Sequence, residues 1–133
     1  MRRAERIVAA ARGLVGVPFR LHGRDARTGV DCIGLAMLSL EGAGHKGLHA
    51  FVPDAYSIRG GSVACFADAM AALGLRKART QHAGDLVLVQ AGPAQFHLMI
   101  ATDGGHVHAH AGLGKVVEMP GASPWPVLGR WRF

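Results

Sequence analysis

The chain has 133 residues, half of them apolar and only 18% charged, which excludes an intrinsically disordered polymer and predicts one domain over residues 1–133. The formal net charge of +6 indicates an anionic environment such as nucleic acid, a membrane surface or an acidic cell-wall polymer. The basic residues are scattered with few aromatic residues between them, so we expect no nucleic-acid binding. No apolar run approaches the ~18 residues that a membrane span needs, so we expect no membrane insertion.

The N-terminal segment predicts a helix over residues 3–15 rather than a signal peptide. Apolar residues recur there at helical spacing, at Ile7, Val8, Ala11, Leu14 and Val15. Arg6 and Arg12 interrupt the continuous apolar stretch that a signal peptide requires. Gly16 and Pro18 then end the helix. We therefore expect synthesis in the cytoplasm without a signal peptide.

A second helix is predicted from Cys32 to about Gly42. The polar, Gly-containing residues 20–29 predict a loop before it, and Asp31 has the side chain of a helix N-cap. Because this helix is apolar nearly all round, we expect it to be buried on most sides. The N-terminus that carries Cys32 should therefore lie inside the fold.

Residues 43–61 predict a long loop containing Tyr56, of the kind that often acts as a lid, and a third helix follows over residues 62–73. After Asp85 the pattern changes to strands, which we expect at residues 86–90, 95–102, 106–111, 115–119 and 127–133. Turn residues predict hairpins between the first four strands. The predicted fold class is α+β, with N-terminal helices and the Cys32 helix packed on a C-terminal antiparallel sheet of about five strands.

The two cysteines, Cys32 and Cys65, are expected to be free thiols, because one disulfide is no scaffold in a chain with an adequate core. Backbone N–H groups at a helix N-terminus lower the pKa of a thiol, so the position of Cys32 suits a nucleophile. A buried structural cysteine is the alternative interpretation of Cys32. It is the favoured one for Cys65, which lies in the middle of a predicted helix.

Histidines on two adjacent predicted strands offer partners for Cys32. His97 begins one strand, and His106, His108 and His110 share one face of the next. One of these three imidazoles can fix the tautomer of His97, as a third residue does in a catalytic triad, and we select His108. The pattern predicts a cysteine hydrolase with Cys32 as nucleophile.

A metal-binding module on His97, His106 and His108 is the rival interpretation, because a His-x-His pair on a strand can bind zinc. Neither a Cys-x-x-Cys nor a His-Glu-x-x-His motif accompanies these residues. We therefore expect no metal and no cofactor.

Five short motifs lie along nearly the whole chain, at residues 16–20 (GVPFR), 31–35 (DCIGL), 84–87 (GDLV), 97–100 (HLMI) and 107–109 (VHA). In this order and spacing they resemble the motifs of the NlpC-type cell-wall peptidases, which are papain-like cysteine endopeptidases that cut peptidoglycan stem peptides. The resemblance implies a papain-like fold and cleavage of the γ-D-glutamyl-diaminopimelate bond.

By that resemblance Cys32 is the nucleophile, His97 the general base and His108 the polar third member, and the backbone N–H of Cys32 helps to hold the oxyanion. Phe19 stands where the family usually has Tyr, and Ile33 where it usually has Ser. We expect substrate contacts from Phe19, Asp31, Ile33 and Tyr56.

The lack of a signal peptide, the Arg- and Gly-rich loop before Asp31 and the C-terminal run from Val117 to Phe133 resemble the branch found in tailed phages and gene transfer agents. That branch implies a phage-like tail tip acting in the periplasm or cell wall, with other tail or hub proteins as partners. A catalytically weak structural tail-tip protein of the same fold is the alternative.

Overall fold

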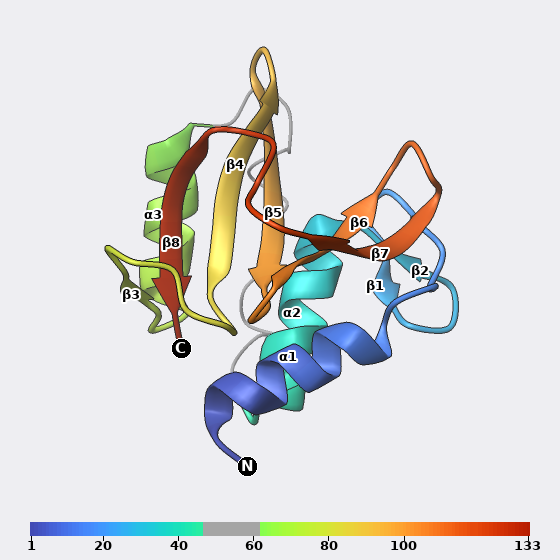
Figure 1. Ribbon diagram of the computed structural model, residues 1–133, viewed down its shortest axis with the longest axis horizontal. Helices are drawn as coiled ribbons and strands as arrows, with labels where there is room; N and C mark the ends of the chain where they lie inside the picture. The colour runs from blue at the N-terminus through green and yellow to red at the C-terminus, as the bar shows by residue number, and fades with distance from the viewer. Residues whose placement is uncertain (47–61) are drawn as a thin grey trace.

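The computed structural model describes residues 1–46 and 62–133, and it joins three helices to a six-stranded antiparallel sheet (Figure 1). The helices are α1 (Arg3–Gly13), α2 (Cys32–Gly42) and α3 (Val63–Ala72). The strands of this sheet are β3 (Arg76–Lys77), β4 (Leu86–Gly92), β5 (Gln95–Ala101), β6 (Gly105–His110), β7 (Lys115–Pro120) and β8 (Val127–Arg132). The strand order is β3-β8-β4-β5-β6-β7, which confirms the predicted α+β class and antiparallel sheet.

Three short strands differ from the prediction. Residues 20–29, predicted as a loop, contain the hairpin β1 (Arg24–Asp25) and β2 (Gly29–Val30). The main sheet has six strands rather than about five, because β3 pairs with β8 at its edge. Strands of two residues are too short for alternation to appear in the sequence, so only their pairing reveals them.

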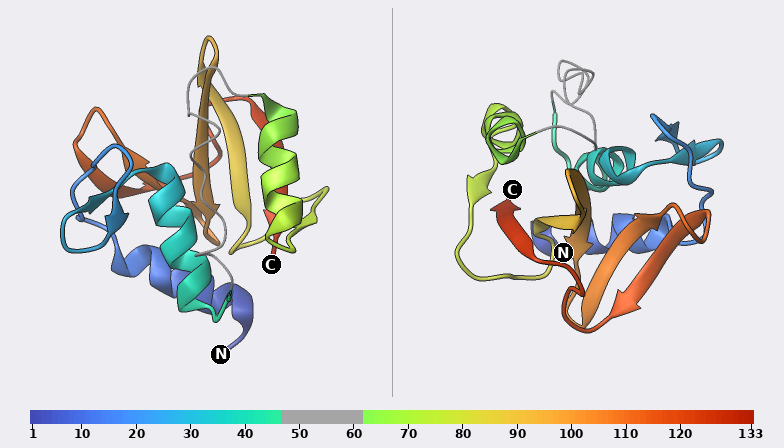
Figure 2. Two further views of the ribbon diagram at one scale, coloured as in Figure 1. Left: turned by 180° about the vertical axis from the view of Figure 1, so that it is seen from behind. Right: turned by 90° about the horizontal axis from the view of Figure 1, so that it is seen from above.

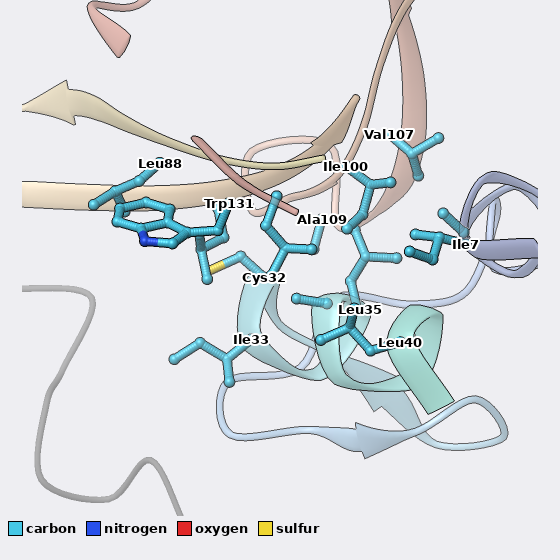
Figure 3. Packing of buried hydrophobic residues seen from close by; sticks show 14 of the residues in the cluster. Ile7, Cys32, Ile33, Leu35, Leu40, Leu88, Ile100, Val107, Ala109 and Trp131 are labelled. Atoms are coloured by element: carbon cyan, nitrogen blue, oxygen red, sulfur yellow. The ribbon is translucent and has the colours of Figure 1, made fainter. Parts of the chain in front are cut away.

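The main core lies between the three helices and one face of the sheet. Figure 2 shows α2 and α3 on the same side of β8, β4 and β5. Figure 3 shows side chains from α1, α2 and the strands meeting there, among them Ile7, Leu35, Leu40, Leu88, Ile100 and Val107. As predicted, α2 is buried on most sides, so its N-terminus lies inside the fold.

The opposite face of the sheet has a second, smaller core. It consists of Val87, Val89, Met99 and Ala101. Three further residues pack against these four: Met119 of β7, Trp125 of the connection between β7 and β8, and Val127 of β8. The connection from β7 to β8 is therefore fastened to this face by apolar contacts.

Strands β5 and β6 separate along their length, and this separation makes room for the end of α2. They pair only at Ile100 with Val107 and at Ala101 with His106. Beyond these pairs β6 and β7 turn away from the direction of β4, β5 and β8 (Figure 1). The helix α2 contacts both β5 and β6, and its first residue, Cys32, lines one cavity with His97 and His108.

The β1–β2 hairpin region packs against the first turn of α2 through glycines. A Cβ on Gly34 would overlap the carbonyl oxygen of Gly23, and a Cβ on Gly23 would overlap the carbonyl oxygen of Gly29. No side chain larger than hydrogen fits between these backbone segments. The close approach fixes where the N-terminus of α2 lies relative to the hairpin.

We predict that Gly34→Ala lowers the free energy of unfolding by about 1–3 kcal/mol or more, since the added methyl group meets backbone that has no room to move. Urea denaturation followed by circular dichroism measures this change. Gly13→Ala in α1 is the matched control, because a Cβ there meets nothing within 4 Å and alanine favours a helix. Equal stability of Gly34→Ala and the parent chain would contradict the close packing of the hairpin on α2.

Candidate active site

A cavity of about 580 Å³ gathers nearly all of the predicted site residues. Cys32, His97 and His108 line it together with Phe19, Asp31 and Ile33. Tyr56 lies outside the described residues. The residues selected from separate parts of the sequence therefore come together at one place.

His97 and His108 are joined by a hydrogen bond of 3.0 Å between His97 Nε2 and His108 Nδ1. This bond occupies one ring nitrogen of His97 and leaves Nδ1 to accept a proton. In that tautomer His97 Nε2–H donates to His108, which is only 2% exposed. His108 thus stands in the position of a residue that orients a general base.

Cys32 is the first residue of α2 and is 2% exposed. Its thiol interacts with the backbone of Leu98, the residue that directly follows His97. Backbone hydrogen bonds at Leu98 and at Cys32 itself lower the pKa of the thiol. The thiol of Cys32 therefore lies next to β5 at the residue that follows the base candidate, His97.

The sequence predicted a lowered pKa for the Cys32 thiol, and the structure corrects this prediction. Burial outweighs the backbone hydrogen bonds and raises the pKa of Cys32 to about 12. Burial also lowers the pKa of His97 to about 3, assisted by His108 and His110, and that of His108 to about 4, assisted by His110 and His106. At neutral pH the resting site holds a neutral thiol beside two neutral imidazoles.

Asp31 organises the entrance to α2. Its carboxylate accepts hydrogen bonds from Gly34 N at 2.9 Å, His22 N at 2.9 Å and Arg24 Nη1 at 2.8 Å. The predicted N-cap is thus confirmed, and its other two partners are new. Because Asp31 is 1% exposed and its recorded bonds all go to the chain itself, its part in binding substrate remains a prediction.

Phe19 and Ile33, which stand where the family motifs usually have Tyr and Ser, contribute apolar surface to the cavity. Ile33 follows Cys32 in α2, and it is 6% exposed. The backbone of Phe19 is fixed by its N–H, which donates to the Gly114 carbonyl at 2.8 Å. Both side chains are in place to touch a ligand, and that role remains a prediction.

Trp125 is a cavity residue that the sequence analysis did not select. Its ring lies edge-on to both imidazoles, with centroids 5.9 Å from His97 and 5.7 Å from His108. Ser123 fixes its backbone by accepting from Trp125 N and donating to Trp125 O. A single aromatic residue in a Pro- and Gly-rich connection carries no periodic signal, so only the structure identifies it.

His106 does not join His97 and His108. Its Nε2 lies 2.9 Å from the Gln81 side chain, which in turn accepts a hydrogen bond from Arg130. Across residues 1–46 and 62–133, His, Cys, Asp and Glu side chains form no group of three able to hold a metal ion. None of the helices in this part of the chain is long and apolar enough to cross a membrane.

The fold is that of the NlpC/p60 domains of known structure, which confirms the predicted papain-like arrangement. NlpC1 from Trichomonas vaginalis superposes with a TM-score of 0.65 at 18% identity, over 98% of this chain and 45% of that one. The NlpC/p60 domain of the peptidoglycan hydrolase SagA gives 0.56 at 24% identity, over 88% of each chain. The peptidoglycan hydrolase RipB from Mycobacterium tuberculosis gives 0.58 at 21% identity, over 98% of this chain and 64% of that one.

This chain therefore spans less than two thirds of the length of two of these three proteins. No protein-family model and no curated protein matches the sequence. At identities below 25% these likenesses establish the fold.

We predict that iodoacetamide modifies Cys32 more slowly than the exposed Cys65 at pH 7.5, because a raised pKa leaves little thiolate. The rate at Cys32 should rise with pH without reaching a plateau below about pH 10. Mass spectrometry of the single-cysteine variants Cys65→Ser and Cys32→Ser measures each rate alone. A Cys32 rate that is already maximal near pH 7 would show that a thiolate exists in the resting protein.

We predict that Trp125→Ala raises the pKa of His97 and His108 toward the ordinary value of 6.5, because water then reaches both imidazoles and burial is the main cause of their lowered pKa. Titration of the histidine ring protons by NMR measures the shift. Trp125→Phe is the control that keeps an aromatic ring over the pair. Identical titration curves for Trp125→Ala and the parent protein would contradict the shielding role.

Proposed function

We propose that the chain is a cysteine peptidase of the NlpC/p60 type that hydrolyses an amide bond in peptidoglycan. The observation that carries this proposal is the meeting of Cys32, His97 and His108 in one cavity, with His97 Nε2 bound to His108 Nδ1 at 3.0 Å. The fold supports it, since the peptidoglycan hydrolases SagA and RipB share this fold.

In the proposed first step, the Cys32 sulfur attacks the scissile carbonyl carbon while its proton passes to His97 Nδ1. Since both groups are neutral at rest, His97 acts as a general base rather than as the partner of a preformed thiolate. The backbone N–H of Cys32 then donates to the oxyanion of the tetrahedral intermediate. His108 accepts the Nε2–H of His97 throughout and holds the ring in the required tautomer.

In the second half, the intermediate collapses to a thioester as the leaving amine takes the proton from His97. Water then attacks the thioester, gives its proton to His97, and the Cys32 sulfur leaves and recovers that proton. The bond we propose is the γ-D-glutamyl-diaminopimelate amide of the stem peptide. No metal or cofactor enters these steps.

We further propose that the domain works in a phage-like tail tip, opening the wall locally from the periplasm or cell wall, with other tail or hub proteins as partners. The resemblance of the loop before Asp31 and of the C-terminal run to that branch supports this. A catalytically weak structural protein of the same tail tip is the second candidate, and the deep burial of the Cys32 thiol favours it.

We predict that Cys32→Ala lowers the release of peptide fragments from purified sacculi by about a thousandfold or more, because no other group replaces the nucleophile. Liquid chromatography with mass spectrometry identifies the fragments and hence the bond. Cys65→Ala should keep full activity, since Cys65 is exposed on α3 and does not line the cavity. Equal fragment release by Cys32→Ala and the parent protein would sink the assignment, and no release by either would favour the structural candidate.

A further inference from the structure

Arg24 is a cation at the wall of the cavity for which the proposed mechanism has no use. It belongs to β1 and lines the same cavity as Cys32. Its side chain is 31% exposed, and its charge lies close enough to lower the pKa of the Cys32 thiol. The charge of Asp31, which raises that pKa more, and the charge of Arg24, which lowers it, therefore both lie near the reacting sulfur.

The guanidinium of Arg24 is held in place by one of its nitrogens only. Nη1 donates to Asp31 Oδ1 at 2.8 Å and to the Gly23 carbonyl at 2.9 Å. Among the described residues, Nη2 and Nε of Arg24 have no hydrogen-bond partner. A guanidinium has five donors in a fixed planar fork, so a further carboxylate can bind to the free edge.

The remaining charges around the cavity favour an anionic ligand over a cationic one. Asp31 is the only acidic residue among the described residues that line it, and the hydrogen bonds of its carboxylate go to His22, Arg24 and Gly34. The other titratable lining groups are imidazoles and the Cys32 thiol. The described residues that line the cavity thus offer hydrogen-bond donors that can bind a carboxylate. They offer no unpaired carboxylate that could bind an ammonium group.

We propose that Arg24 determines specificity by binding a substrate carboxylate next to the scissile amide, with Asp31 as the residue that positions its guanidinium. The identity of this carboxylate rests on the proposed function: it would be the free α-carboxylate of the γ-linked D-glutamyl residue. Substrates in which that carboxylate is amidated would be poor ones.

The test compares N-acetyl-L-alanyl-γ-D-glutamyl-meso-diaminopimelate with its D-isoglutaminyl counterpart, which differs only in an amide in place of the carboxylate. The parent protein should show a kcat/KM about tenfold to a hundredfold higher for the carboxylate peptide, the range expected for a hydrogen bond between charged groups. Arg24→Gln should bring the ratio close to one by losing activity on the carboxylate peptide alone. Arg24→Lys, which keeps the charge without the fork, should retain part of the preference.

Arg27→Gln is the matched control. Arg27 lies in the same hairpin, but its side chain is 89% exposed, pairs with Asp25 and does not line the cavity. This variant should leave the ratio unchanged. An equal loss on both peptides in Arg24→Gln would assign Arg24 a purely structural role and overturn the proposal, as would a parent protein that does not discriminate between the peptides.

Binding of both peptides to the Cys32→Ala variant, measured by calorimetry, separates this proposal from the hydrolase assignment. Tighter binding of the carboxylate peptide, lost on adding Arg24→Gln, supports the role of Arg24 even where the parent protein cleaves neither peptide. Equal binding of the two peptides overturns it, whatever the outcome of the cleavage assay.

Discussion

The site depends on the buried carboxylate of Asp31. By accepting from the N–H of Gly34 it caps α2 and sets the direction of the helix that begins at Cys32. By accepting from His22 and Arg24 it fastens the segment that precedes that helix to its first turn. A carboxylate that is 1% exposed is costly without such partners, so the three bonds form together and hold the helix start and Arg24 at one cavity.

The second constraint is the separation of β5 and β6, and it affects the protonation states of the site residues. Where β5 and β6 separate, the start of α2 contributes Cys32 to the cavity that His97 of β5 and His108 of β6 also line. The same enclosure removes water from all three groups and stabilises their neutral forms. The enclosure thus orients the three groups but keeps the Cys32 thiol protonated. In the proposed mechanism the transfer of its proton to His97 is therefore part of the reaction.

The sequence predicted what local patterns determine. Helical spacing, the caps and strand alternation located the three helices and the five longer strands, and the N-cap at Asp31 placed Cys32 at a helix start. It could not give the sign of the pKa shift at Cys32, because the helix terminus lowers the pKa while burial, which depends on packing with distant strands, raises it more. The sequence did not identify Trp125 and Arg24 as cavity residues for a related reason. Each lines the cavity because of tertiary contacts, which produce no periodic pattern in the sequence.

The charges at the cavity link recognition to reactivity. Arg24 and Asp31 form an ion pair of 2.8 Å at the cavity wall. Neither is among the causes of the lowered pKa of His97, which are burial and the neighbouring His108 and His110. A carboxylate bound at Arg24 would add one negative charge to the cavity that His97 also lines, and an anion near an imidazole raises its pKa because it stabilises the protonated form. A general base works best when its pKa approaches the working pH. Because burial holds the pKa of His97 at about 3, a rise caused by a bound carboxylate would favour the proton transfer. An amidated substrate brings no such charge, so it would lose in the rate of the chemical step as well as in binding.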